Sequence, residues 1–426
     1  MVRCMTTYNF DKITNRKGTN CLKYDFAVER GKPADVLPLW VADMDFPVSE
    51  EISKSLHAAV EHGIYGYTQP KDAYYNAVMN WMERKHNWKT KREWIVKTPG
   101  VVFALGAAVK AFTDPGDAIL IQNPVYYPFT NIIRDNDRKV VDNTLVYHSV
   151  TERTVVPVTT DDASEQQINN VGTVSPAYQI DFEDFEREIE QEHVKLFILC
   201  NPHNPVGRVW TVEELQKLGE ICLRHHVIVV SDEIHNDFVY PGYEHTVFAN
   251  VDPRFAEFTL TCTAPSKTFN LAGLQISNIF IPNENLRKAF KTEIDRTGYD
   301  EPNALGVVAC EAAYRAGEDW LDQLKAYLLK NLNFLRDFLQ EKLPQIHLVE
   351  PEGTYLVWLD CSELGITGKE LDQFIVDKAG LWLDGGSMFG PDGAAFQRVN
   401  IACPQATLEL ALNKLKAAVE GYGNHL

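Results

Sequence analysis

The chain has 426 residues, with 41 Lys and Arg against 59 Asp and Glu, and a formal net charge of −18 at pH 7. Its 45% hydrophobic and 23% charged residues form an ordinary globular composition, which excludes a disordered chain. The length predicts two or three domains. The acidic balance, without a basic cluster, argues against nucleic acid and anionic membranes as partners.

The N-terminus and the cysteines predict a cytoplasmic protein. Residues 1–18 lack the apolar core of a signal peptide, and no apolar run is long enough to span a bilayer. None of the eight cysteines forms a C-x-x-C pair, as expected of free thiols in a reducing compartment. No H-E-x-x-H, P-loop or G-x-G-x-x-G motif occurs, so we predict no metal site and neither a Walker-type nor a Rossmann nucleotide site.

Short apolar runs typical of strands alternate with helical stretches through the middle of the chain. Buried strands that alternate with helices predict an α/β fold with a mostly parallel sheet covered on both faces. Ligands bind such sheets beyond the carboxyl ends of the strands, so functional residues are expected there. The expected elements are strands at Trp94–Lys97, Ala118–Gln122, Lys195–Cys200, Val227–Val230, Phe258–Thr263 and Gln275–Ile281, and helices at Val101–Phe112 and Glu213–His225.

The sequence changes in character after about residue 300. A long amphipathic run at Trp320–Leu343 precedes several short strand-like segments. We predict a large domain of residues 48–300 and a smaller α+β domain of residues 1–47 and 301–426. Residues 149–178, rich in Ser, Thr, Asn and Gln, are expected to form a surface insertion or an extended hairpin. The late elements are strands at His347–Val349, Thr354–Asp360, Leu381–Leu383 and Gln397–Ile401, and a helix at Ala406–Tyr422.

Three predicted strands end in unusual polar sequences. Ser-Asp-Glu-Ile-His (231–235) follows a valine-rich strand, where a helix cap is the alternative interpretation of the acid. Ser-Lys-Thr-Phe-Asn (266–270) places a lysine near a buried strand end, which is costly unless the amine is paired, modified or neutral. Asn-Pro-His-Asn-Pro-Val-Gly-Arg (201–208) is a stiff turn. An acid, a lysine and a rigid amide loop at three strand ends favour a functional site over a surface loop.

These motifs, followed by Arg-Val-Asn-Ile-Ala-Cys-Pro (398–404), resemble those of the pyridoxal-phosphate (PLP) enzymes of the aspartate aminotransferase fold, fold type I. The similarity extends from about Phe10 to the C-terminus. Trp-Val-Ala-Asp-Met-Asp-Phe (40–46) and His-Gly-Ile-Tyr-Gly-Tyr (62–67) further resemble the C–S β-lyases of the MalY/PatB group, which includes cystathionine β-lyases. The resemblance implies a mostly parallel seven-stranded sheet between helices, a smaller α+β domain, PLP as cofactor and a homodimer with shared active sites.

The resemblance also implies roles for single residues. Lys267 would form the Schiff base with the cofactor and then act as the base at the substrate Cα. Asp232 would face the pyridine nitrogen and keep it protonated, so that the ring accepts electrons. Asn204 would donate to the 3′-oxygen of the cofactor, with His235 nearby in an unassigned role.

The cofactor phosphate needs hydrogen-bond donors, which a helix start after a strand supplies. By the resemblance, Tyr67 would reach the phosphate from a neighbouring subunit. Many relatives carry an arginine eight positions after the lysine, but this chain has Gln275 there, which leaves the balance of the phosphate charge open. The implied phosphate ligands are Gly100, Val101, Val102, Ser266 and Tyr67.

Two further site residues follow from the resemblance. Arg398 would bind the substrate α-carboxylate as a two-pronged fork, where a surface arginine is the alternative. Tyr126 would stack on the cofactor ring, with core packing or a role for Tyr127 as alternatives. The implied reaction is β-elimination from cystathionine or a related S-substituted L-cysteine to pyruvate, ammonia and a thiol. The alternatives are a class I/II aminotransferase and a regulatory protein that retains the cofactor.

Overall fold

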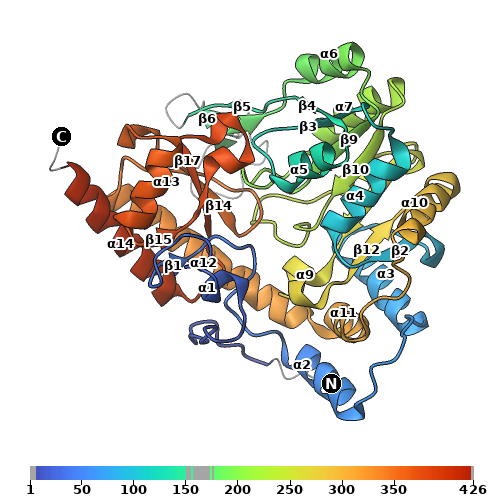
Figure 1. The fold of residues 1–426 in the computed structure, drawn as a ribbon, viewed down its shortest axis with the longest axis horizontal. Helices are drawn as coiled ribbons and strands as arrows, with labels where there is room; N and C mark the ends of the chain where they lie inside the picture. Colours follow the sequence, from blue (N-terminus) through green and yellow to red (C-terminus); the bar gives the residue numbers. More distant parts are fainter. Residues whose placement is uncertain (1–5, 150–154, 157–172, 175–176, 424–426) are drawn as a thin grey trace, which may run out of the picture.

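The computed structural model describes residues 6–149, 155–156, 173–174 and 177–423, and its main feature is a seven-stranded sheet (Figure 1). The strand order is β2-β12-β11-β10-β9-β3-β4, and within this sheet β12 alone runs antiparallel to its neighbours. The predicted α/β class with a mostly parallel seven-stranded sheet is therefore confirmed. The strands are β2 (Ile95–Thr98), β3 (Ala118–Ile121), β4 (Lys139–Asp142), β9 (Leu196–Cys200), β10 (Ile228–Asp232), β11 (Thr259–Thr263) and β12 (Ser277–Phe280).

Helices cover both faces of this sheet because its strands are apolar on both faces. In β9, Leu196 and Ile198 pack in a cluster with α4, α5 and α10. Phe197 and Leu199 point the other way and pack with α6 and α7. The five helices are α4 (Val101–Phe112), α5 (Pro128–Asp135), α6 (Phe182–Glu192), α7 (Val212–Arg224) and α10 (Glu284–Arg296).

A second, four-stranded antiparallel sheet lies beside the first, in the order β13-β14-β17-β16. The predicted strand at Leu381–Leu383 is not part of it: β15 (Leu381–Trp382) pairs in parallel with β1 (Leu37–Pro38). This pairing ties the N-terminal segment to the C-terminal part, and the division into 48–300 and 1–47 with 301–426 stays a prediction. The four strands are β13 (His347–Val349), β14 (Leu356–Asp360), β16 (Asp384–Gly385) and β17 (Phe396–Asn400).

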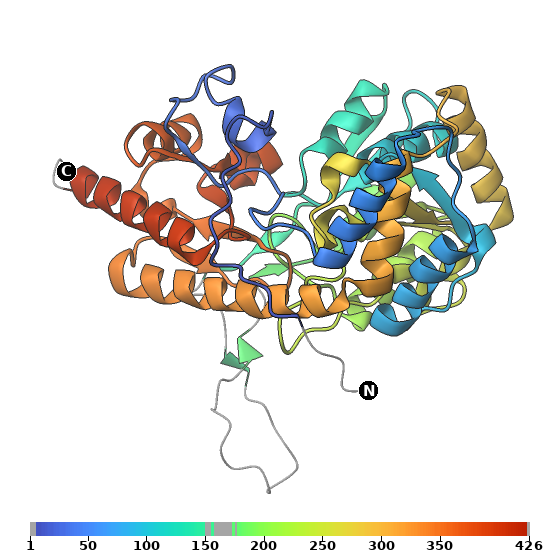
Figure 2. The ribbon, with the colours of Figure 1, turned by 90° about the horizontal axis from the view of Figure 1, so that it is seen from below.

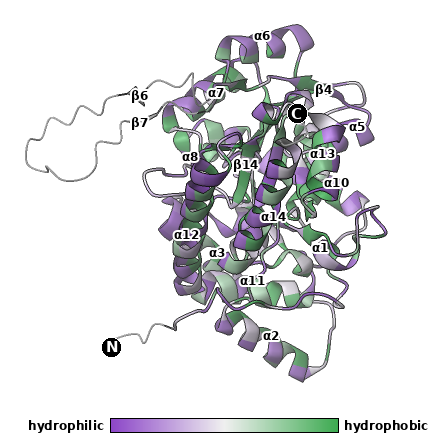
Figure 3. Ribbon diagram, turned by 90° about the vertical axis from the view of Figure 1, so that its left-hand side faces the viewer, coloured by the Kyte–Doolittle hydropathy of each residue, from purple (hydrophilic) through white to green (hydrophobic). Residues whose placement is uncertain are grey.

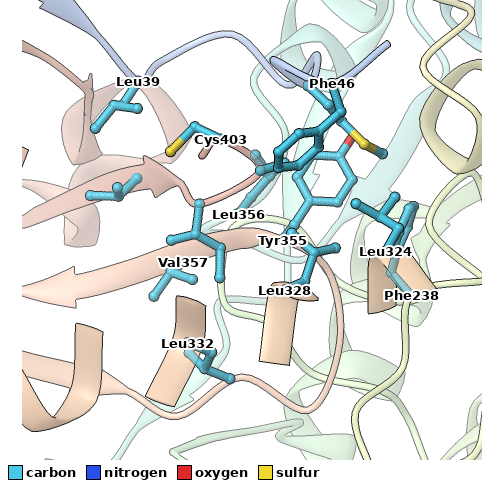
Figure 4. Close-up of a cluster of buried hydrophobic side chains, with 14 of the residues drawn as sticks. Leu39, Phe46, Phe238, Leu324, Leu328, Leu332, Tyr355, Leu356, Val357 and Cys403 are labelled. Atoms are coloured by element: carbon cyan, nitrogen blue, oxygen red, sulfur yellow. The ribbon is translucent and has the colours of Figure 1, made fainter. Parts of the chain in front are cut away.

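The long helix α12 (Glu318–Lys342) runs along both parts of the molecule (Figure 2). Its residues Leu324, Leu328 and Leu332 pack in one core cluster with Tyr355 and Leu356 at the start of β14 (Figure 4). The helix α14 (Gln405–Gly423) lies beside it (Figure 3), and α13 (Gly368–Asp377) packs against β15. The amphipathic run predicted at Trp320–Leu343 is thus a helix that joins the two sheets through their apolar residues.

Several helices of the structure were not predicted from the sequence. Helices α2 (Glu50–His62) and α3 (Asp72–His86) each pack against α11 (Ala304–Ala316), and α2 is capped by Ser49. No helix in the described ranges is long and apolar enough to cross a membrane. The seven cysteines within those ranges are free. The short helices are α1 (Leu22–Asp25), α8 (Phe248–Val251) and α9 (Pro265–Thr268).

The polar stretch at 149–178 is described only in part. Strand β6 (Val155–Val156) pairs with β7 (Thr173–Val174) in antiparallel fashion, and the two lie apart from both large sheets (Figure 2). Strands β5 (Val146–Tyr147) and β8 (Tyr178–Gln179), next to the two ends of this stretch, form a second antiparallel pair. These pairings favour the hairpin version of the prediction, whose remaining residues lie outside the described ranges.

Candidate active site

The three polar strand ends are neighbours, because β9, β10 and β11 lie side by side and run in parallel. The register places Asp232 level with Cys200 on one side and Cys262 on the other. The loops that follow these strands therefore leave the sheet at one edge. The structure thus brings the predicted Asn204, Asp232 and Lys267 segments to one place.

Lys267 lies in the short helix α9, directly after β11, and its side chain is partly buried. Its Nζ donates a hydrogen bond to the backbone oxygen of Ala42, at 2.8 Å. Burial and the charge of Arg398 lower the pKa of the amine to about 8, although Asp43 and Asp232 oppose the shift. A lysine in this position carries a neutral, nucleophilic amine far more often than an ordinary lysine at the same pH.

Asp232 ends β10 and is buried, and its Oδ1 accepts a hydrogen bond from the Ile234 N–H at 3.2 Å. Burial raises the pKa of this carboxyl to about 7, while the Ile234 N–H and the charge of Lys267 lower it. His235 is buried nearby, and within the described part of the chain its Nδ1 has no hydrogen-bond partner. Burial, Lys267 and Arg398 hold the pKa of this imidazole well below its usual value.

Arg398 on β17 joins the second sheet to the site. Its Nη1 donates to Asn204 Oδ1 at 2.9 Å and its Nη2 donates to the backbone oxygen of Trp40 at 3.0 Å. It also forms an ion pair with Asp384, its neighbour across the β16–β17 pair. The guanidinium carbon lies 4.9 Å from the centre of the Phe389 ring. Arg398 is therefore a buried, oriented cation that contacts the loop of Asn204, which rules out the surface alternative.

Tyr126 and Tyr127 follow β3, with their ring centres 5.5 Å apart. Burial raises the pKa of Tyr126, and the charge of Asp232 adds to this while the charge of Arg398 opposes it. Burial also raises the pKa of Tyr127, on which Asp384 and Arg398 act. Both candidate stacking residues thus border the same charged cluster.

The predicted phosphate donors lie at the adjoining strand ends. Helix α4 begins after Gly100 with no side-chain cap, so the first N–H groups, including those of Val101 and Val102, are available to an anion. Thr98, at the end of β2, hydrogen-bonds Ser277 at the start of β12 at 2.7 Å between their hydroxyl oxygens. Ser266 lies on α9, after the adjacent strand β11.

Tyr67 and Gln275, the two other residues considered for the phosphate site, are both exposed. The Tyr67 side chain is 95% exposed, so within one chain it is not packed among the other site residues. Gln275 is exposed at the end of a short 3₁₀ helix, Ala272–Leu274. Within the described ranges, neither side chain has a hydrogen bond or an ion pair to Gly100 or Ser266.

Three residues that interact within the site were not predicted from the sequence: Ala42, Tyr355 and Asp384. The Ala42 carbonyl accepts from Lys267 and also from the Tyr355 hydroxyl, at 3.1 Å. A backbone oxygen leaves no mark in a sequence, although the segment 40–46 was one of the strings behind the resemblance. Asp384 stands before two glycines, a pattern typical of a turn, and only the strand register reveals that it faces Arg398.

A mostly parallel sheet with a lysine, an acid and an amide at three adjoining strand ends defines the fold of the type I PLP enzymes. Residues 34–415 match the family model of the class I and II aminotransferases, and the chain belongs to this family. It is 44% identical to the cystathionine beta-lyase PatB of Bacillus subtilis (strain 168), over 96% of this chain and 100% of that one.

Two further proteins show the same similarity. The chain is 30% identical to Protein MalY of Escherichia coli (strain K12), over 97% of this chain and 99% of that one. The crystal structure of cystalysin from Treponema denticola, which contains pyridoxal 5′-phosphate, matches with a TM-score of 0.89 at 36% identity, covering 98% of this chain and 100% of that chain. The resemblance to the MalY/PatB group is confirmed.

Proposed function

We propose that this protein is a PLP-dependent C–S β-lyase that cleaves cystathionine or a related S-substituted L-cysteine. The reaction adds one water and gives a thiol, pyruvate and ammonium, so that the C–S bond and the C–N bond of the amino acid are both broken. The similarity to PatB along nearly the whole chain supports this choice among the activities of the fold.

The residues at the strand ends fit the proposed cofactor. Asp232 is a buried carboxylate with one backbone donor and a pKa raised to about 7 by burial, so a protonated ring nitrogen would supply the cation it lacks. The uncapped start of α4 offers N–H groups and the helix dipole to a phosphate. Lys267 supplies an amine whose pKa, about 8, suits covalent attachment to an aldehyde.

When bound, pyridoxal phosphate supplies an electron sink for the carbanion at the substrate Cα. Lys267 would hold the cofactor and, as a free amine, would remove the proton from the substrate Cα. The Ala42 carbonyl, 2.8 Å from Nζ, holds the freed amine beside the site. Asp232 maintains positive charge at the ring nitrogen, and the amide of Asn204 is free to donate through Nδ2 because Oδ1 is the atom that binds Arg398.

Arg398 orients the substrate through its carboxylate. A guanidinium binds a carboxylate with two parallel hydrogen bonds, which fixes the direction of the Cα–H bond. Asp384 and the Trp40 carbonyl hold the arginine in place from behind, so it needs no reorientation to receive the substrate. Tyr126 is the candidate for stacking on the cofactor ring, with Tyr127 beside it.

The single observation that carries the proposal is the juxtaposition of Lys267 and Asp232 on adjoining strand ends in a chain that matches a cystathionine beta-lyase over its full length. An aminotransferase of the same family would use these residues in the same way up to proton removal from Cα. It would then transfer the amino group to a keto acid and release no thiol. The fate of the leaving thiolate therefore separates the two activities.

The test is to incubate the purified, PLP-loaded protein with L-cystathionine and to measure pyruvate and free thiol together. We expect equal amounts of both without an added keto acid, and none from the Lys267→Ala variant. A matched control is Lys330→Ala, an exposed lysine on α12 outside the site. Amino exchange that depends on a keto acid, with no thiol released, would replace the lyase by the aminotransferase.

We also propose a cytoplasmic homodimer in which each active site receives Tyr67 from the neighbouring subunit. The exposed ring of Tyr67 and the exposed Ile64 and Tyr65 beside it support this arrangement, because apolar side chains in a row are typical of a contact surface. The charge left unbalanced by Gln275 would then be met by backbone donors and by the partner's hydroxyl.

A further inference from the structure

A cavity lies outside the candidate active site. It has a volume of about 520 Å³ and lies between α12, the end of α3 and the loop 236–245 that follows β10. Its lining shares no residue with Asn204, Asp232, Lys267 and Arg398. A volume of this size is within the range of small-molecule sites. The cavity is thus large enough for a ligand that the proposed reaction does not use.

Part of the cavity lining is an apolar wall. Leu321, Leu328 and Leu329 of α12 form this wall together with Phe238 and Val239 of the loop 236–245. Leu328 and Phe238 belong to the main core cluster, so this wall is backed by packed side chains. Such a surface binds an aliphatic or aromatic group by removing it from water.

The most buried acid of the cavity lining, Asp237, already has three side-chain partners. Asp237 accepts hydrogen bonds from Thr268 Oγ1 at 2.6 Å, from Trp81 Nε1 at 3.1 Å and from His86 Nε2 at 3.0 Å. Burial by itself would raise its pKa, but the bonds and charge of His86, with those of Thr268 and Trp81, lower it overall. Asp237 therefore stays an anion whose partners belong to the protein.

Two buried polar groups of the lining have no protein partner within the described residues. His245 Nε2 donates to Glu233 Oε2 at 3.0 Å, but its Nδ1 has no hydrogen-bond partner. The side chain of His245 is only 2% exposed, so open water does not satisfy it. The hydroxyl of Tyr240 is likewise buried without a partner. Both atoms have almost no accessible surface, so they lie within the wall of the cavity and do not select its occupant.

The charged residues of the lining leave one cation and one anion unpaired. Lys85 forms ion pairs with Glu318 at 2.7 Å and with Asp322 at 3.6 Å. Among the described residues, the half-buried Lys325 and the exposed Glu244 have no ion pair, and both border the cavity. Burial lowers the pKa of Lys325 and Lys85 adds to this, while Asp237 and Asp322 oppose it. The cavity therefore suits a ligand with one charge of each sign.

We propose that this cavity binds a free amino acid with an apolar side chain, as a zwitterion. Lys325 binds its carboxylate, Glu244 binds its ammonium group, and the leucine-rich wall of α12 binds its side chain. Leucine, methionine and phenylalanine have this chemistry. The proposal concerns a site separate from the lyase site and does not rest on the proposed function.

The experiment is equilibrium dialysis of radiolabelled L-leucine against the PLP-loaded protein after reduction with borohydride, which fixes the cofactor to Lys267 and closes the first amino-acid site. Leucine has no leaving group at Cβ, so a lyase cannot consume it. We expect saturable binding of one leucine per chain. Lys325→Met and Glu244→Gln should each weaken it by at least about tenfold, since each removes one charge-assisted contact.

Matched controls separate the site from general effects. Lys330→Met removes an exposed lysine from the same helix, which does not line the cavity, and should leave leucine binding unchanged. Ala326→Trp places a large ring in the cavity and should abolish leucine binding. This variant tests the site independently, should Lys325→Met fail to fold. Circular dichroism shows whether each variant is folded.

Competition tests the assignment of the two charges. 4-Methylpentanoate lacks the ammonium group and 3-methylbutylamine lacks the carboxylate, so each should compete with leucine at least about tenfold more weakly than leucine itself. Equal competition by either compound, or leucine binding that survives Ala326→Trp, would overturn the proposal. So would the absence of saturable binding for leucine, methionine and phenylalanine. Cleavage of cystathionine by the unreduced protein is measured separately and stands or falls by itself.

Discussion

Three charged side chains set the electrostatics of the candidate active site. Asp232 is buried with a single backbone donor, and its pKa rises to about 7. Burial and Arg398 both favour the neutral form of Lys267, whose pKa falls to about 8. Arg398 itself is held by Asp384 and by the Trp40 carbonyl. The surroundings thus favour the neutral amine that Lys267 needs, whereas the carboxylate form of Asp232 needs a nearby cation, such as a protonated ring nitrogen, to offset its burial.

The protein without cofactor should bind PLP at a rate that follows the neutral fraction of Lys267. Its folded pKa, about 8, is below the ordinary lysine value of about 10.4, so the amine becomes neutral at a lower pH. We expect the rate to rise about tenfold per pH unit up to this pKa and then to level off. Stopped-flow absorbance of the attached cofactor measures it.

The second cause of the shift gives the control. Arg398→Gln removes the cationic neighbour but leaves the burial of Lys267, so the inflection should move to higher pH without reaching the value of a free lysine. A wild-type inflection near the ordinary lysine pKa would show that the site does not lower the pKa of the amine.

Replacing Arg398 by lysine should damage substrate binding more than cofactor binding. Lysine keeps the charge but cannot form the two parallel bonds of a guanidinium. The loss of about one charge-assisted bond and of orientation should lower kcat/KM for cystathionine by roughly 10²-fold, or about 3 kcal/mol. The absorbance of bound cofactor, measured on the same sample, should change little. A variant that loses its cofactor instead would place Arg398 in the cofactor site.

At the scale of elements, the sequence predicts those helices and strands whose limits are set by their own hydrophobic pattern. The helix at Val101–Phe112 and the strand at His347–Val349 have the predicted limits. Helix α3 has a Tyr- and Trp-rich face buried against α11. The sequence pattern of α3 does not indicate that α11 is the helix it packs against. Likewise β16 has two residues and includes Gly385, so only its neighbour β17 defines it as a strand. Elements that are fixed by tertiary contacts could not be predicted from the sequence, and the role of Asp384, which lies in β16, was therefore missed.

Two helical glycines should respond to alanine in opposite directions. A Cβ at Gly219 in α7 would lie 2.1 Å from Phe255 Cε2, inside a packed cluster, whereas a Cβ at Gly106 in α4 would meet no atom within 4 Å. Gly106→Ala should therefore stabilise the protein by about 0.5–1 kcal/mol through helix propensity. Gly219→Ala should destabilise it by about 1–3 kcal/mol, because overpacking outweighs propensity.

The measurement is the unfolding midpoint of both variants beside the wild type. The pair is matched, since each change adds one methyl group to the interior of a helix. Equal shifts in the same direction would mean that Phe255 moves aside freely and that α7 is not packed as described.

At the scale of the whole molecule, residues 40–46 connect the two sheets around the candidate site. The Trp40 carbonyl accepts from Arg398 and the Ala42 carbonyl accepts from Lys267. Asn400 Nδ2 donates to the carbonyls of Val41 and Asp43, at 2.6 and 2.7 Å.

Side chains from both parts of the molecule hold the far end of this segment. Asn270 Nδ2 donates to the carbonyls of Met44 and Phe46, each at 3.0 Å. Arg16 pairs with Asp43 and Asp45, at 2.5 and 2.7 Å. The segment acts mainly through its backbone, so its sequence supported the family resemblance without showing what it does.

The proposed homodimer predicts that two defective chains restore each other. If Tyr67 serves the site of the neighbouring subunit, a hybrid of a Lys267→Ala chain and a Tyr67→Phe chain has one site with neither change. Random mixing of equal amounts gives half hybrids, so about a quarter of wild-type lyase activity should return beyond the residual activity of Tyr67→Phe alone.

The chains are unfolded together, refolded with PLP and assayed for pyruvate. A Lys267→Ala chain that also carries Tyr67→Phe should restore nothing, because the hybrid then lacks an intact site. Activity that stays at the average of the two separate proteins would mean that Tyr67 acts within its own chain or outside the site.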